Sequence, residues 1–126
     1  MQLRLLSCDN HTLTAHAPKA PNLNDKGTIF GGSSSALMTV CGWSLIKYNL
    51  EQRSCAHDVV IARADTQWHR AQTDDLLITA QCETNWPDIL TALDNRQQPQ
   101  INVRAQVNNQ QSQPCTTMTA TYVVLI

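Results

Sequence analysis

The residues best suited to chemistry form a loop that ends in a glycine pair and runs into an apolar segment. The loop spans residues 21–33, with the sequence PNLNDKGTIFGGS. The apolar segment over residues 34–46 predicts a buried helix, and the glycine pair, Gly31 and Gly32, stands at its start. The first N–H groups of a helix have no partner inside it and lie at the positive end of its dipole. Such an end can hold a phosphate, a carboxylate or a developing oxyanion, and the alternative is a tight loop-to-helix turn without a ligand.

Side chains around the glycine pair have structural alternatives as well. Asn24 is suited to an Asx-turn that shapes the loop, and Ser33 is suited to capping the helix. A nucleophilic serine needs a nearby base, and the sequence places none there. The cations Lys26, Arg63 and Arg70 could meet phosphates or an acidic partner, or could simply lie on solvated faces.

The elements that must position this loop follow from hydrophobic periodicity and turn residues. Strands are predicted over residues 2–7, 11–17, 58–69, 76–83, 101–107 and 116–126, the helix is predicted to run to about Glu51, and a loop with a short helix is predicted over 85–94. One apolar helix followed by an antiparallel meander indicates an α+β fold, with a sheet of about five strands wrapped on one long buried helix. At 126 residues the chain is predicted to form a single domain over 1–126.

Two details of this pattern carry further expectations. Gly42 lies inside the predicted helix, where glycine costs roughly 1 kcal/mol against alanine, so close packing against the sheet is expected there. The last strand is apolar on both faces, which an isolated chain with an open sheet edge tolerates poorly. Association of copies through the sheet is therefore expected.

Composition excludes several classes of function. The net charge is −1 and no basic run occurs, which argues against a nucleic-acid partner, and no segment is apolar enough for a membrane partner. The five cysteines are odd in number and form no C-x-x-C pair, which predicts free thiols and a cytoplasmic location. Neither they nor the four histidines have metal-ligand spacing, so no metal is expected.

Taken together, these residues resemble the hotdog-fold thioesterase superfamily. The resemblance rests on Asn24, Gly27, Thr28, Phe30, Gly31 and Gly32, then on Ile61, Ala64 and Trp68, and then on Thr73, Asp74 and Asp75. A longer pattern from Ala17 to Ser33, with Gly42 and Trp43, is similar to a bacterial thioesterase domain that occurs alone or behind an acetyltransferase domain. The 17–43 stretch is specific, whereas the rest matches by strand order and weak pattern.

The resemblance implies a homodimer, or a dimer of dimers, with active sites at the interface between subunits. It implies an acyl thioester substrate carried by coenzyme A or acyl carrier protein, with coenzyme A or phosphopantetheine as part of the substrate and no separate cofactor. By position, the N–H groups of Gly31 or Gly32 would polarise the thioester carbonyl, and Asn24 would hold the carbonyl or a water. Thr39 occupies the helix position of the usual catalytic acid. The residues expected to line the substrate site are Asn22, Phe30, Ser33, Arg63 and Arg70.

Three departures from the family pattern keep the reaction open. Phe30 replaces a frequent histidine before the glycine pair, Thr39 replaces a frequent Asp or Glu, and Ala71 replaces a frequent proline. A threonine hydroxyl is a poor general base at neutral pH, which weakens the case for hydrolysis. Thioester hydrolysis is the leading hypothesis. The alternatives are decarboxylation of a malonyl-acyl-carrier-protein in the initiation of fatty acid synthesis, which needs an enolate site but no activated water, and a non-catalytic acyl-carrier-binding module.

Overall fold

The computed structural model describes residues 1–126 as one antiparallel sheet crossed by a long helix. Its elements are β1 (Arg4–Cys8), β2 (Thr12–Ala17), a 3₁₀ turn η1 (Ala20–Asn22), α1 (Gly31–Gln52), β3 (Val59–Trp68), β4 (Leu76–Gln81), α2 (Trp86–Asp94), β5 (Gln100–Asn108) and β6 (Pro114–Val124). The sheet has six strands in the order β1-β2-β4-β5-β6-β3. The α+β class and the long helix against an antiparallel sheet are confirmed, with six strands in place of about five.

The sixth strand comes from the chain's first hairpin. The Asp9 carboxylate accepts the N–H groups of His11 and Thr12, each at 2.8 Å, and so closes the turn between β1 and β2. β1 thereby pairs with β2 and becomes one edge of the sheet, while β3 forms the other edge.

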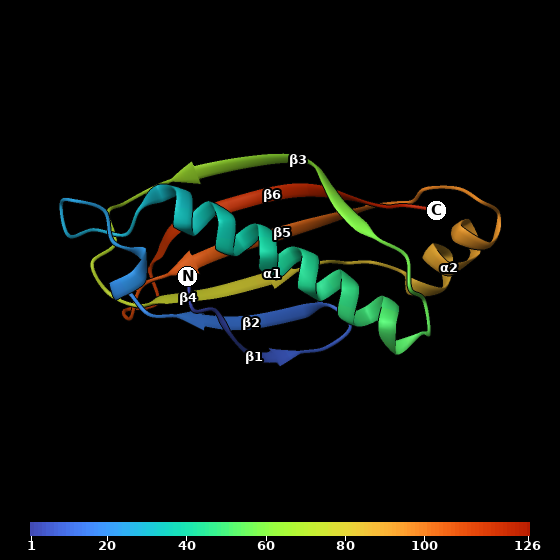
Figure 1. Ribbon diagram of the computed structural model, residues 1–126, viewed down its shortest axis with the longest axis horizontal. Coiled ribbons are helices and arrows are strands. Elements are labelled where there is room, and N and C mark those ends of the chain that lie inside the picture. Colours follow the sequence, from blue (N-terminus) through green and yellow to red (C-terminus); the bar gives the residue numbers. More distant parts are fainter.

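Helix α1 lies across one face of the sheet, with its N-terminal end beside the end of β3 (Figure 1). It buries one side chain or two in every turn, which is the spacing of an amphipathic helix. Gly42 is buried where α1 presses on β6, and a Cβ there would collide with the Tyr122 phenol. The Tyr122 hydroxyl donates to the Thr39 carbonyl oxygen at 2.7 Å, so the packing reason expected for this glycine is confirmed.

The opposite side of α1 and the neighbouring sheet edge remain exposed. Val40 and Trp43 project from the outer side of the helix, and nearly all of β3 is exposed, including Val60 and Ile61. Burial of α1 is therefore confined to one side within a single chain. An apolar surface thus runs from the helix to the open strand edge.

The state of the cysteines, the grouping of possible metal ligands and the lengths of the helices complete the description of the fold. All five cysteines are free thiols, as predicted, and burial raises the pKa of the Cys41 thiol to about 12. No three His, Cys, Asp or Glu side chains gather as a metal site would require. Neither helix has the length and apolarity needed to cross a bilayer.

Candidate active site at the N-terminus of the long helix

A pocket of about 310 Å³ lies between the first turn of α1 and the segment that leaves β3. Its lining residues are Ile29, Gly31, Ser34, Trp68, His69, Arg70, Ala71, Gln72 and Thr116. The strand order explains this meeting, because β3 ends beside the start of α1 and β6 pairs with β3 along its length (Figure 1). Three segments far apart in the sequence, residues 29–34, residues 68–72 and Thr116, therefore share one pocket.

The first two N–H groups of α1 are free; Gly31 lines the pocket, whereas Gly32 is the next residue and lies outside the lining. Phe30 is the N-cap residue and its side chain makes no capping hydrogen bond. Its carbonyl oxygen accepts the N–H groups of Ser33 and Ser34, at 2.9 and 3.3 Å, whereas those of Gly31 and Gly32 have no partner. Two unpaired donors at the positive end of a 22-residue helix favour a carbonyl oxygen or an anion.

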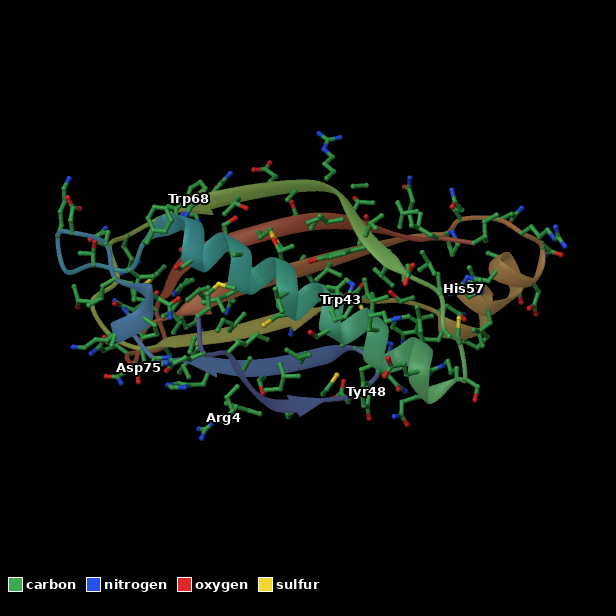
Figure 2. All side chains as sticks on the ribbon, viewed as in Figure 1. Arg4, Trp43, Tyr48, His57, Trp68 and Asp75 are labelled. Atoms are coloured by element: carbon green, nitrogen blue, oxygen red, sulfur yellow. The ribbon has the colours of Figure 1, made fainter.

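Aromatic rings cover both glycines. The Trp68 indole N–H donates to the Gly31 carbonyl oxygen at 3.1 Å, and a Cβ at Gly31 would come within 3.0 Å of the indole nitrogen. The Phe30 ring lies against Gly32, where a Cβ would come within 2.5 Å of it. Figure 2 shows Trp68 beside the beginning of α1. A side chain at either position would therefore require the neighbouring ring to shift, and both rings are 57% exposed.

Asn24 is occupied in building the loop. Its side-chain oxygen accepts the N–H groups of Lys26 and Thr28, at 2.9 and 3.2 Å, and its amide nitrogen donates to the Thr28 hydroxyl at 2.8 Å. Gly27, with φ of +79°, supplies the left-handed residue that this turn requires. Asn24 does not line the pocket, and its contacts are those of the Asx-turn.

Asn22 holds the backbone segment that precedes the helix in position. It is buried, and its amide nitrogen donates to the carbonyl oxygens of Pro18 and Met1, at 2.7 and 3.1 Å. The backbone carbonyl oxygen of Asn22 accepts the Phe30 N–H at 2.8 Å. The backbone carbonyl oxygen of Gln72 accepts the Ile29 N–H at the same distance. The residues before Gly31 are thus held from two sides, but Asn22 lies outside the pocket lining.

The two remaining helix candidates have local contacts. Ser33 was expected to cap the helix, and this is wrong, because α1 begins two residues earlier and Phe30 occupies the cap. Thr39 is half-buried, and its hydroxyl donates to the Ser35 carbonyl oxygen at 2.9 Å. Neither residue lines the pocket.

The two arginines lie on different faces of the sheet. Arg70 lines the pocket, and its guanidinium forms no ion pair or hydrogen bond within the chain. Arg63 pairs with Thr121 on the sheet face opposite α1, where it lines a separate groove of about 370 Å³. The structure therefore places Arg70 in the same pocket as Gly31 and places Arg63 in a different groove.

The charge that lines the pocket is positive. No Asp or Glu lines it, whereas Arg70 and the helix terminus both contribute positive potential. Ser34, Gln72 and Thr116 were not expected at the site, because no local motif marks them and only the strand order brings them together. Trp68 and His69 are neighbours at the end of the predicted strand over residues 58–69. The register of that strand was the signal that could have predicted their position at the pocket.

Comparison with known proteins supports the fold and the family. A family model described as "Putative thioesterase (yiiD_Cterm)" matches residues 1–126. The structure of a "putative thioesterase" from Shewanella oneidensis is similar at 25% identity and a TM-score of 0.88, covering 100% of this chain and 85% of that one. A protein of unknown function from Chlorobaculum tepidum TLS matches at 20% identity and a TM-score of 0.90, covering 99% and 83%. A mutant thioesterase from Pseudomonas aeruginosa matches at 14% identity and a TM-score of 0.78, covering 98% and 81%. Among curated proteins, no sequence matches this chain.

Proposed function

The chain belongs to the family described as "Putative thioesterase (yiiD_Cterm)", and we propose that it acts on acyl thioesters of coenzyme A or of an acyl carrier protein. The observation that carries the proposal is the pair of free N–H groups at Gly31 and Gly32 beside the pocket. Both would donate to the thioester carbonyl oxygen and stabilise the negative charge that develops on it. Loss of one such donor lowers turnover by about 10²- to 10³-fold in well-studied enzymes.

Hydrolysis is the leading reaction. Water adds to the carbonyl carbon, the oxyanion forms at the glycine N–H groups, and the carbon–sulfur bond then breaks to release the thiol. A general base must take the proton from the water, and His69 is the lining residue whose side chain can do so. The His69 Nε2 atom lies 2.7 Å from the Thr117 hydroxyl, so Nδ1 is the ring atom left to take this proton.

Decarboxylation of a malonyl thioester is the second candidate, and the acid-free pocket with its unpaired Arg70 favours it. The guanidinium would hold the free carboxylate of the substrate. The bond between the α-carbon and that carboxylate breaks, CO₂ leaves, and the electron pair moves into an enolate held at Gly31 and Gly32. A solvent proton then adds to the α-carbon and gives the acetyl thioester. A third reading, a non-catalytic acyl-carrier-binding module, predicts binding without turnover.

A homodimer is part of the proposal. Strand β3 has ten residues and an open edge, and unpaired edges of this length promote pairing with another chain. A second copy that pairs β3 with β3 would cover Val60 and Ile61 together with Val40 and Trp43 on α1. Because Trp68 and the start of α1 lie at this same edge, the partner would lie next to the pocket (Figure 2).

The test uses two substitutions at one position. Gly31→Pro removes the N–H, and proline is well tolerated at the first position of a helix. Gly31→Ala is the matched control, since it places a similar Cβ against Trp68 but keeps the N–H. Mass spectrometry would follow acetyl, butyryl and malonyl thioesters of coenzyme A and of an acyl carrier protein incubated with each protein.

Released thiol that is lost in Gly31→Pro and kept in Gly31→Ala supports hydrolysis at this site. Acetyl thioester formed from malonyl thioester, with the same dependence, would replace hydrolysis by decarboxylation. If neither substrate class is turned over, the enzyme proposal fails and the binding module remains.

A further inference from the structure

Two hydroxyl groups that reach the pocket from largely buried residues have no hydrogen-bond partner in the protein. Ser34, one turn into α1, and Thr116, on β6, are each 3% exposed, and both line the pocket. Neither hydroxyl bonds another group of the chain, in contrast to the β6 hydroxyl of Thr121, which bonds the Asn102 side chain at 2.9 Å. These hydroxyls therefore face the pocket, where water bonds them in the free protein and a polar group of a ligand can replace that water.

The helix does not supply this partner for Ser34. A serine inside a helix commonly bonds the carbonyl four residues earlier, as Thr39 does with Ser35. The equivalent oxygen for Ser34 belongs to Phe30, and it already accepts two backbone N–H groups. The Ser34 hydroxyl is therefore available to whatever enters the pocket.

Gln72 adds a third unpaired group to the same wall. Its amide nitrogen donates to the carbonyl oxygens of Asp75 and Asn108, at 2.9 and 3.1 Å, which fixes the orientation of the amide. Its side-chain oxygen is buried and has no partner, although the residue is only 4% exposed. The lining thus contains two unpaired hydroxyls, which can donate to and accept from a ligand, and one unpaired acceptor oxygen that solvent does not reach.

We propose that Ser34 and Thr116 determine substrate specificity and select short acyl groups that carry a hydrogen-bonding substituent near the thioester. This inference rests on the proposed function. With the thioester carbonyl at Gly31, the third carbon of the acyl chain would lie deeper in the pocket, toward the two hydroxyls. A pocket of about 310 Å³ is at the small end for ligand sites, which favours a short chain.

The physical reason is the loss of hydration. A plain alkyl chain that fills the pocket removes water from both hydroxyls and gives them no partner, whereas a 3-hydroxy, 3-oxo or 3-carboxy group replaces that water. Sites built to bond a polar group discriminate strongly against analogues that lack it. We expect a preference of about 10- to 100-fold for 3-hydroxybutyryl- over butyryl-coenzyme A, which corresponds to one or two unmade hydrogen bonds.

The experiment compares kcat/KM for butyryl-, 3-hydroxybutyryl- and malonyl-coenzyme A in the parent chain, Ser34→Ala and Thr116→Val. Thr121→Val is the matched control on the same strand, because its hydroxyl lies on the sheet face away from α1. The ratio of two kcat/KM values from one preparation does not depend on the folded fraction, and Thr116→Ser tests rescue by a hydroxyl. Calorimetric binding of non-hydrolysable thioether analogues of the butyryl and 3-hydroxybutyryl substrates gives a readout besides turnover.

The expected result is a parent preference that falls toward unity in Ser34→Ala and Thr116→Val and persists in Thr116→Ser and Thr121→Val. Equal rates for the butyryl and 3-hydroxybutyryl substrates in the parent would overturn the inference while leaving thioester turnover in place. A preference for malonyl alone, abolished by Arg70→Gln and unchanged in the hydroxyl variants, would overturn it as well. If no thioester is turned over, the proposed function fails, and the binding preference of the thioether analogues then decides the inference separately.

Discussion

The indole N–H of Trp68 donates to the carbonyl oxygen of Gly31 at 3.1 Å, which joins the last residue of β3 to the first residue of α1. This bond sets the position of the helix terminus at the edge of the sheet. The same edge of the sheet is unpaired in the single chain, so the bond also couples the candidate site to that open edge.

Trp68→Phe keeps most of the ring and removes the donor. We expect a loss of about 1 kcal/mol in the free energy of unfolding, typical of one neutral hydrogen bond, together with a lower kcat/KM for thioester turnover. Trp43→Phe is the control, since its indole N–H donates to the Val59 carbonyl oxygen at 3.0 Å, away from the pocket. Urea unfolding and steady-state kinetics on both variants make the comparison. An equal fall in kcat/KM for both would contradict a specific role for Trp68.

Gly42→Ala tests the contact between α1 and β6. The added methyl group would meet the Tyr122 phenol, which is buried and held by its bond to Thr39. Overpacking of this kind costs about 1–3 kcal/mol, more than the roughly 1 kcal/mol that alanine gains over glycine in a helix. Chemical unfolding should show a net loss that is smaller when Tyr122→Phe is present. A stabilised Gly42→Ala protein would show that the helix can move away from β6.

Asn24 and Thr28 should behave as a coupled structural pair. Asn24→Ala removes three hydrogen bonds of the loop, and Thr28→Val removes the hydroxyl that one of them reaches. A double-mutant cycle should give a coupling of about 0.5–1.5 kcal/mol in the free energy of unfolding. Retained stability with a turnover loss of 100-fold or more in Asn24→Ala would instead assign this residue to the chemistry.

The carboxylate of Asp75 predicts a pH dependence of stability. It accepts the Lys19 N–H at 2.9 Å and lies 3.1 Å from His16 Nε2, and these two contacts lower its pKa. A lowered folded-state pKa stabilises the protein above the unfolded value, near 4, and this contribution is lost as the pH falls through the folded value.

Urea unfolding at several pH values between about 5 and 3 would therefore show the parent losing stability relative to Asp75→Asn. Asp25→Asn is the control, because Asp25 is exposed and makes no hydrogen bond or ion pair. A constant difference between the parent and Asp75→Asn across this range would refute the role of Asp75.

The open edge of β3 predicts that a charged residue placed there weakens the proposed dimer. Ile61→Lys puts a charge at the proposed interface and should weaken the dimer by about tenfold or more, the equivalent of 1.4 kcal/mol. Leu77→Lys is matched in exposure, 38% against 39% for Ile61, and lies on β4 away from that edge. Sedimentation equilibrium would compare the three proteins. A monomeric parent chain would refute the dimer.

Much of this fold could be predicted from local chemistry along the chain. Alternating apolar residues predicted β5, turn residues predicted the hairpin of β1 and β2, and the glycine pair predicted the helix terminus. These signals can be read from the sequence because backbone geometry repeats every few residues, and the alternation of apolar and polar side chains follows that repeat. Each of the six strands lies within or close to a predicted range, although the sheet was expected to have only about five.

The composition of the pocket was decided by the tertiary structure. Ser34, Gln72 and Thr116 meet only because the order of the strands places β3 and β6 beside the start of α1. Arg63 and Arg70 look alike in the sequence, yet β-strand alternation and the end of β3 put them on different sides of the sheet. Asn24, which had suggested a catalytic amide, bonds its own loop in the structure, because a hydrogen-bonding group takes the partners that the fold brings within reach.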